Sequence, residues 1–365
     1  MNAQSPIISI IVPVHQGGTV LRASLAAIAA SDLPRELWEL IVVDDASTDD
    51  TVIIAAEYAD CLVRLPTRHG PAYARNRGVE MSRGSLLAFF DARVCPHPDA
   101  LRRMVELLDA QPDVSAVFGA YDTKPAARGF VSQYRNLLHH YVHHRSAGEA
   151  ETFWAGCGAI RRDVFMAAGM YDEWKYTRAQ IEDVELGHRV RTLGNRILLE
   201  PAIQCTSMRR WRLRDVIRSD FKDRGVPWTR LLMQMRAMAR TTTLNLATVE
   251  KLNTVLVWVA AGLLAVAAVT RSAIAGWATA GAILFLLASS APFYSFLRRE
   301  RGIAFALGAI PLHLLYYLNN GLAVAYGWLA HHTVGEPTPD ALTQAFAEVG
   351  MQVWPPVRRG RTAHR

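Results

Sequence analysis

Residues 7–45 read IISIIVPVHQGGTVLRASLAAIAASDLPRELWELIVVDD. Two runs rich in β-branched residues, 7–14 and 38–45, flank a segment in which Leu21, Leu25 and Ile28 recur at helical spacing. Both runs are apolar almost throughout, which is typical of strands that are covered on both faces of a sheet. The stretch therefore predicts a strand, a helix and a second, parallel strand.

The alternation of strands and helices continues along the chain. The apolar patterns predict strands at residues 61–65, 85–90 and 114–121, and helices at residues 50–58, 71–82, 130–145 and 181–193. They predict an α/β fold with a mostly parallel, Rossmann-like sheet and helices on both faces, which we place at residues 1–208. No GxGxxG motif follows the first strand, which argues against dinucleotide binding.

Polar side chains follow the ends of several predicted strands. In a parallel sheet these ends share one edge, and ligands bind beyond it. Asp45 has a simpler alternative role, as the cap of the helix that begins near residue 49. The residues at the strand ends are Pro13, Val14, His15, Asp44, Asp45, Asp91 and Arg93.

Two later segments carry groups that suit a functional site. Residues 154–158 read WAGCG, where glycines beside an aromatic side chain allow close approach to a ligand or form an ordinary turn. The helix near residue 181 opens with Glu182, Asp183 and Glu185, and carboxylates are favoured there by the helix dipole alone. Their mutual repulsion also raises the proton affinity of one of them, which would suit a general base.

The segment 130–145 carries His139, His140, His143 and His144. Histidines four residues apart can hold zinc, but no acidic or cysteine ligand accompanies them in this segment. We interpret the group as a polar helix face near the membrane or near a bound substrate.

Beyond residue 251 charged residues nearly vanish. The apolar runs 252–270, 273–297 and 303–330 each reach the roughly 20 residues that a membrane helix needs. Arg298, Arg299 and Arg301 should lie in the cytosol, together with the N-terminal domain. The pattern predicts a multi-pass protein of the cell membrane, with transmembrane helices in residues 251–332.

Three spans would place the polar, basic tail at 333–365 on the opposite side of the membrane. One run could instead be re-entrant, and Asn319, Asn320 and Gly321 are expected to interrupt the third. Residues 209–250 alternate basic and apolar side chains and resemble an amphipathic, interfacial linker, with a plain domain-closing helix as the alternative. The basic clusters of this linker lie next to the membrane runs, and the net charge of the chain is only +7. Both features favour anionic lipid headgroups over nucleic acid as the binding partner.

The N-terminus shows no signal peptide, and the four cysteines lack CxxC spacing. We expect free thiols in a reducing compartment.

Five segments, taken together and in order, resemble the family 2 glycosyltransferases with the GT-A fold, of the membrane-associated bacterial type with C-terminal transmembrane helices. They read IISIIVPVHQ, IVVDDASTDDT, PAYARNRGVEMSRGSLLAFFDAR, FWAGCGAIRRDVF and IEDVELGHRVRTLGNRILLEP. The resemblance implies a nucleotide-sugar donor laid across the strand ends. Asp183 matches the catalytic base of inverting members, with Glu182 beside it.

The resemblance also assigns residues to the donor and acceptor sides. Asp45 would pair with the base of the donor, with Asp44 beside it. The nucleotide-sugar-binding residues would be Pro13, Val14, His15, Asp44, Asp45, Arg75, Asp91 and Arg93. The acceptor side would hold Trp154, Gly156, Cys157, Arg210 and Trp211.

Asp91 matches the first acid of the family's DxD element, whose second acid holds Mg²⁺ or Mn²⁺, but Arg93 stands at that second position. Three interpretations remain open. A divalent cation binds through Asp91 and another acid such as Asp99, Arg93 replaces the cation, or the site has lost activity.

The resemblance implies a membrane-bound inverting glycosyltransferase that uses a UDP-sugar in preference to other donors. A lipid or lipid-linked molecule on the cytosolic face would be the acceptor. The alternatives are a processive polysaccharide synthase and a non-catalytic nucleotide-sugar-binding scaffold. The spacing from Gln204 to Trp211 is too long for the QxxRW element of processive synthases.

Overall fold

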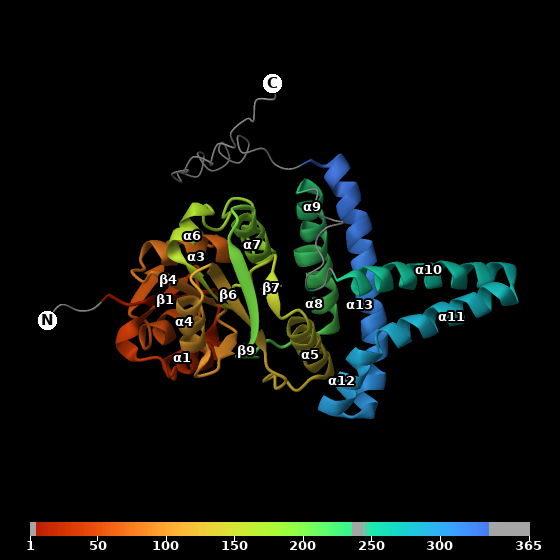
Figure 1. The fold of residues 1–365 in the computed structure, drawn as a ribbon, viewed down its shortest axis with the longest axis horizontal. Helices are drawn as coiled ribbons and strands as arrows, with labels where there is room; N and C mark the ends of the chain where they lie inside the picture. Colours follow the sequence, from red (N-terminus) through yellow and green to blue (C-terminus); the bar gives the residue numbers. More distant parts are fainter. Residues whose placement is uncertain (1–4, 236–243, 245–246, 336–365) are drawn as a thin grey trace, which may run out of the picture.

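The computed structural model describes residues 5–235, 244 and 247–335. A nine-stranded sheet forms the centre of the N-terminal domain, in the order β3-β2-β1-β4-β8-β6-β9-β5, with β7 paired to β9 (Figure 1). The strands are β1 (Ile8–Val14), β2 (Trp38–Asp44), β3 (Cys61–Arg64), β4 (Leu86–Phe90), β5 (Val94–Pro96), β6 (Val114–Tyr121), β7 (Gly148–Ala150), β8 (Cys157–Arg161) and β9 (Arg196–Ser207).

The N-terminal half of the sheet is parallel, as predicted. β1 pairs in parallel with β2 and β4, and β2 pairs in parallel with β3. Beyond β4 the sheet is mixed, because β8 is antiparallel to both β4 and β6, while β9 is parallel to β6. β8 begins within the segment that the sequence analysis treats as a glycine-rich turn, since its sequence CGAIR carries a weak strand signal.

Helices cover both faces of the sheet, as predicted. On one face, α1 (Gly18–Ala29), α2 (Thr51–Ala56) and α4 (Ala100–Ala110) share a buried cluster with Ile10 and Val12 of β1. On the other face, α3 (Pro71–Glu80), α6 (Arg162–Ala167) and α7 (Glu182–Thr192) share a second cluster with Ile11 and Phe89. A short 3₁₀ turn, η1 (Arg35–Leu37), precedes β2.

Helix α5 (Phe130–Arg145) has the predicted limits, but only two of its four histidines, His139 and His144, keep a partly exposed side chain. His140 and His143 are buried, and their Nδ1 atoms lie 2.7 and 3.0 Å from the carbonyl oxygens of Tyr121 and Gly119. These histidines therefore fasten α5 to β6. No group of three or more potential metal ligands occurs within residues 5–235 or the rest of the described chain, so a zinc site finds no support.

The segment after β9 is helical, as predicted. It comprises α8 (Leu213–Arg218), the π-helix η2 (Ser219–Gly225) and α9 (Val226–Gln234). It lies between the sheet domain and α13 (Ile303–Thr333), where Asn319 Nδ2 donates to the carbonyl oxygen of Ile217 at 3.2 Å (Figure 1). The remainder of the predicted linker, residues 236–243 and 245–246, lies outside the described residues.

Helices α10 (Thr248–Thr270) and α11 (Ala273–Ser289) form a hairpin that projects from the body of the molecule, and α12 (Ala291–Arg301) returns the chain to its base (Figure 1). Large apolar side chains cover the outside of the hairpin, including Val269, Ile274 and Trp277, which are 79–84% exposed. Arg301 Nε donates to Gln133 Oε1 at 2.9 Å, so the base of the hairpin touches the sheet domain.

The prediction of three membrane spans is not supported. Among the described helices, α10 alone is long and apolar enough to cross a membrane, and α11 with α12 qualifies only as a pair bent by 58°, a broken span or a re-entrant loop. The third predicted span forms α13, which runs across the base of the hairpin and continues unbroken through Asn319, Asn320 and Gly321 (Figure 1). Most of the predicted tail, residues 336–365, lies outside the described residues.

Candidate active site

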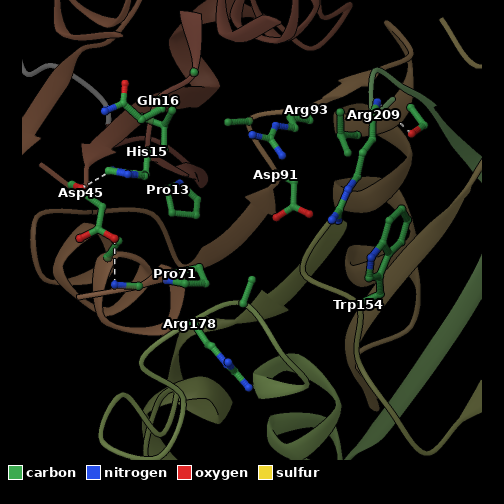
Figure 2. A pocket seen from close by; sticks show the side chains of 18 of the residues that line it. Pro13, His15, Gln16, Asp45, Pro71, Asp91, Arg93, Trp154, Arg178 and Arg209 are labelled. Carbon is green, nitrogen blue, oxygen red and sulfur yellow. Dashed lines mark hydrogen bonds between the residues drawn. The ribbon is translucent and has the colours of Figure 1, made fainter. Parts of the chain in front are cut away.

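A cavity of about 370 Å³ opens at the carboxyl ends of the strands (Figure 2). Since β6 and β9 run in the same direction as β4, the residues after β1, β2, β4, β6 and β9 all reach this one edge. The sequence-predicted residues that line the cavity are Pro13, Val14, His15, Asp45, Asp91, Arg93, Trp154 and Trp211. Most of the residues predicted at the strand ends therefore line one cavity.

The Asp45 carboxylate forms one wall of the cavity. Its Oδ1 and Oδ2 accept hydrogen bonds from the backbone N–H groups of His69 and Gly70, at 2.7 and 2.8 Å. Gly70 is required there, because its φ is +96° and a Cβ would lie 2.4 Å from the carbonyl oxygen of Thr177. Asp45 thus fixes the loop before α3.

The alternative role of Asp45 as a helix cap is not observed. Asp49, in place of Asp45, accepts the backbone N–H of Thr51, at 3.2 Å. Asp44 is buried and does not line the cavity, because its Oδ1 accepts the backbone N–H of Ser47 at 3.1 Å.

Arg75 lies directly behind the cavity wall. Its Nη2 donates to Asp91 Oδ1 at 2.9 Å and its Nη1 donates to Glu182 Oε1 at 2.8 Å. The Arg75 and Glu182 side chains are only 4% and 6% exposed, whereas the Asp91 side chain is 48% exposed and reaches the opening. Arg75 therefore positions Asp91 from below and does not face a donor directly.

Glu182 lies beneath the cavity and accepts hydrogen bonds on both carboxylate oxygens. Its carboxylate is buried, and its second oxygen accepts the backbone N–H of Gln180 at 2.8 Å. With both oxygens engaged, Glu182 has no open approach to an acceptor. Asp183 remains as the candidate catalytic carboxylate of this pair.

The Asp183 carboxylate lies beside the cavity wall formed by Trp154, although Asp183 is not itself a lining residue. Its Oδ2 accepts the backbone N–H of Ala155 at 3.2 Å, and its side chain keeps partial solvent exposure. Burial, followed by repulsion from Glu182, raises the pKa of Asp183 to about 7, against the opposing charge of Arg75. The group therefore titrates near neutral pH.

Trp154 forms an aromatic wall with residues of α5. Its ring lies edge-on to Tyr121 and His143, and His139, which lines the cavity, contacts the same ring. A Cβ on Gly156 would lie 2.4 Å from the Trp154 indole, so only glycine permits this ring position. Cys157 is buried in β8 and does not reach the cavity.

Arg209, and not the predicted Arg210, lines the cavity beside Trp211. Arg210 is exposed elsewhere, whereas the Arg209 guanidinium stacks on the Trp211 ring at 3.7 Å. Burial, followed by repulsion from Arg224 and Arg93, lowers the pKa of Arg209 to about 10. Sequence reasoning missed Arg209 because its position depends on the pairing of β9 with β5, residues 94–96, far away in the chain.

Arg224 is a second lining residue that the sequence did not predict. It lies on the π-helix η2, an irregular helix type that often occurs at functional sites. In total, the cavity is lined by two aspartates, Asp45 and Asp91, and by six arginines, which are Arg68, Arg93, Arg135, Arg178, Arg209 and Arg224.

The residues at Asp91 do not fit a divalent cation. Arg75 already occupies one oxygen of Asp91, and Arg93 stands where a second carboxylate would be needed. Asp99, the other predicted ligand, pairs with Arg103 and does not line the cavity. The described residues also lack any group of three histidines, cysteines or acids that could hold a metal ion.

Part of the chain is similar to known proteins. Residues 9–169 match the family model described as glycosyl transferase family 2. The glycosyltransferase AglE of Haloferax volcanii is 32% identical over 113 residues, which cover 30% of this chain and 37% of AglE. The Escherichia coli protein WfgD, named a UDP-Glc:alpha-D-GlcNAc-diphosphoundecaprenol beta-1,3-glucosyltransferase, is 27% identical over 119 residues, 32% of this chain and 46% of WfgD.

A solved structure shares the fold. The mannosyltransferase PcManGT from Pyrobaculum calidifontis, determined in complex with GDP-Man and Mn²⁺, superposes with a TM-score of 0.53 at 21% identity, covering 91% of this chain and 88% of PcManGT. The chain spans less than half the length of AglE and WfgD. Its N-terminal domain has the predicted GT-A-like α/β fold, and residues 9–169, less than half of the chain, are similar to glycosyl transferase family 2.

Proposed function

We propose that the chain transfers a sugar from a nucleotide-sugar donor to a hydroxyl or phosphate oxygen of an acceptor, with inversion at the anomeric carbon. The observation that carries the proposal is the Asp183 carboxylate, held against Ala155 beside an arginine-lined cavity at the carboxyl ends of the strands. Arginine side chains bind diphosphates through paired, charge-assisted hydrogen bonds. The relatives supply the class of donor, because they are named as glycosyltransferases.

The proposed reaction is one displacement. The acceptor oxygen forms a bond to the anomeric carbon while the bond from that carbon to the donor phosphate breaks, and the nucleoside diphosphate leaves with the electron pair. When the acceptor is a hydroxyl, Asp183 takes its proton, which turns a poor nucleophile into an effective one, whereas a phosphate oxygen attacks in its ionised form. Arginine side chains stabilise the negative charge that develops on the leaving group.

We place the acceptor in a membrane. The exposed apolar hairpin of α10 and α11 provides the surface that a bilayer would cover, and α10 has the length and composition of a span. Arg301 ties the base of this hairpin to the sheet domain near α5, whose His139 lines the cavity. The lipid-diphosphate acceptor in the name of WfgD supports a lipid-linked acceptor for this chain.

A transfer assay tests this proposal. The full chain in lipid vesicles is incubated with radiolabelled UDP-sugars and GDP-sugars, in vesicles that contain polyprenyl phosphate or lipid-linked saccharides and in vesicles that lack them. We expect label in the lipid fraction only when a lipid acceptor is present. Label that appears only on soluble acceptors would contradict the membrane acceptor, and the absence of any transfer would contradict the enzyme.

The pKa of Asp183 predicts the pH profile of this reaction. A base accepts a proton only in its ionised form, and burial raises the pKa of Asp183 to about 7. We therefore expect kcat/KM to fall about tenfold for each pH unit below that pKa and to level off above it. Initial rates from pH 5 to pH 9 check the profile. A flat profile across this range would contradict the assignment of Asp183 as the base.

We further propose that the hairpin, and not three spans, anchors the chain, with α13 lying in the headgroup layer. Exposed Tyr326, Trp328 and Leu329 on α13 suit this layer. Ser272 at the tip of the hairpin would then face the outside, while Arg299 would stay on the side of the sheet domain.

Cysteine labelling tests this topology. We expect a membrane-impermeant maleimide to label a Ser272→Cys variant on intact spheroplasts, and to label an Arg299→Cys variant only after permeabilisation. The four native cysteines all precede residue 206 and serve as the internal control for permeabilisation. A Ser272→Cys variant that is labelled only after permeabilisation would contradict a crossing hairpin.

A further inference from the structure

We infer that three arginines, Arg93, Arg209 and Arg224, bind the diphosphate of the donor in place of a divalent cation. We call these residues the arginine cluster. The inference rests on the proposed function and goes further, because it assigns diphosphate binding to two residues, Arg209 and Arg224, that the family resemblance did not indicate.

The arginine cluster carries charge that no acid of the described chain neutralises. Arg135 pairs with Asp220, and Arg178 lies 3.7 Å from Asp223. In contrast, no carboxylate in the described part of the chain forms an ion pair with Arg93, Arg209 or Arg224. A cavity wall with surplus positive charge is arranged for an anion.

The two aspartates of the cavity offset this positive charge only in part, through the Asp91 charge that acts on Arg209. Both oxygens of Asp45 accept backbone N–H groups, and one oxygen of Asp91 accepts a hydrogen bond from the buried Arg75. Arg75 thereby offsets part of the Asp91 charge before any ligand binds, since its other nitrogen pairs with Glu182. A divalent cation at Asp91 would meet the positive charges of both Arg75 and Arg93, and a single shared carboxylate is a poor set of ligands for such a cation.

The backbone brings the cluster together. Val94 of β5 stands opposite Ser207 of β9, and the backbone N–H of Met208 donates to the carbonyl oxygen of Arg93 at 2.9 Å. This pairing holds Arg93 and Arg209 side by side at the end of the sheet, and both side chains point toward the opening near Asp91 (Figure 2). Arg224 reaches the same cavity from η2, and its charge acts on Arg209.

The cluster suits the chemistry of the leaving group. When the bond to the anomeric carbon breaks, the departing nucleoside diphosphate gains negative charge on its terminal phosphate. Guanidinium groups that stay protonated through the reaction neutralise this charge and donate two parallel hydrogen bonds each. In the GT-A enzymes that the chain resembles, the second acid of the DxD element and its metal would neutralise this charge. In this chain Arg93 occupies the position of that second acid.

Calorimetric binding tests the inference on the full chain in detergent, with UDP and GDP as probes and UMP and GMP as references. For the unaltered chain we expect the affinity for the diphosphate to change less than about twofold when EDTA replaces Mg²⁺ or Mn²⁺. We expect Arg209→Gln and Arg224→Gln to weaken diphosphate binding roughly 10- to 100-fold, with a smaller effect on the monophosphates. Arg209→Lys keeps the charge and should recover part of the loss.

Arg214→Gln is the matched control, because Arg214 lies on the same segment and is 79% exposed outside the cavity. Diphosphate binding that EDTA abolishes and Mn²⁺ restores would overturn the arginine cluster and leave the proposed function standing. Diphosphate binding by both glutamine variants as tight as that of the Arg214→Gln control would overturn the cluster in the same way. Failure of every nucleotide to bind, with or without a cation, would overturn the proposed function together with this inference.

Discussion

Replacement of Asp183 by asparagine is expected to lower kcat/KM for sugar transfer by roughly 10²- to 10⁴-fold, the usual contribution of a positioned general base. The asparagine side chain keeps the size of the carboxylate and can still accept the N–H of Ala155, but it cannot take the acceptor proton. The variant should therefore lose sugar transfer in vesicles but keep nucleotide binding in detergent. Transfer collapses, while the affinity for the nucleoside diphosphate stays within about twofold, because the arginine-lined cavity is unchanged.

The control is Asp163→Asn, which alters an exposed aspartate in the first turn of α6 and should leave transfer unchanged. The pair of variants also separates an enzyme from a nucleotide-sugar-binding scaffold. A scaffold would keep its cellular role in the Asp183→Asn variant, since nothing in that role requires proton transfer. Wild-type rates of transfer in this variant would contradict the role of Asp183.

Replacement of Arg75 by methionine is expected to lower the free energy of unfolding by about 3–5 kcal/mol, the range measured when one member of a buried ion pair is removed. Methionine fills much of the space of the arginine side chain. It leaves Glu182 buried without its ion-pair partner and removes the hydrogen bond to Asp91. The decrease should appear as a lower midpoint of thermal unfolding of the chain in detergent, followed by near-UV circular dichroism.

Two further variants sharpen this prediction. Arg103→Met removes a partly exposed ion pair with Asp99 and should lower the free energy of unfolding by less than about 1 kcal/mol. The double variant Arg75→Met with Glu182→Gln should recover much of the stability, because it removes the buried charge that the single variant leaves unpaired. An Arg75→Met midpoint equal to that of Arg103→Met would show that the buried network does not stabilise the fold.

The sequence predicted the edge of the sheet where the cavity lies, because apolar strands that alternate with helices run parallel and gather their carboxyl ends. Pro13, Asp45 and Asp91 could be placed there by this rule alone. The different environments of Glu182 and Asp183 could not be predicted from the sequence. Neighbouring carboxylates at a helix start look alike in sequence, and only the contact with Arg75 distinguishes them.

The C-terminal half was predicted less completely, for a physical reason. Hydropathy reports which helices avoid water, but not whether lipid or protein covers them. Residues 303–330 are apolar because one side of α13 packs against α9 and the sheet domain, where Gly327 lies against Thr229. Arg209 and Arg224 escaped prediction for a related reason, since strand pairing and a π-helical turn bring them to the cavity.

The close packing of η2 against α13 links the cavity to the C-terminal helices. A Cβ on Gly225 would lie 2.6 Å from Ala323 Cβ, and the preceding residue, Arg224, lines the cavity. The backbone of η2 at Gly225 therefore packs directly against the side chain of Ala323 on α13, with no room for a larger residue. A displacement of α13 toward η2 would therefore press on the helix that carries Arg224, so the C-terminal helices are in direct contact with one wall of the cavity.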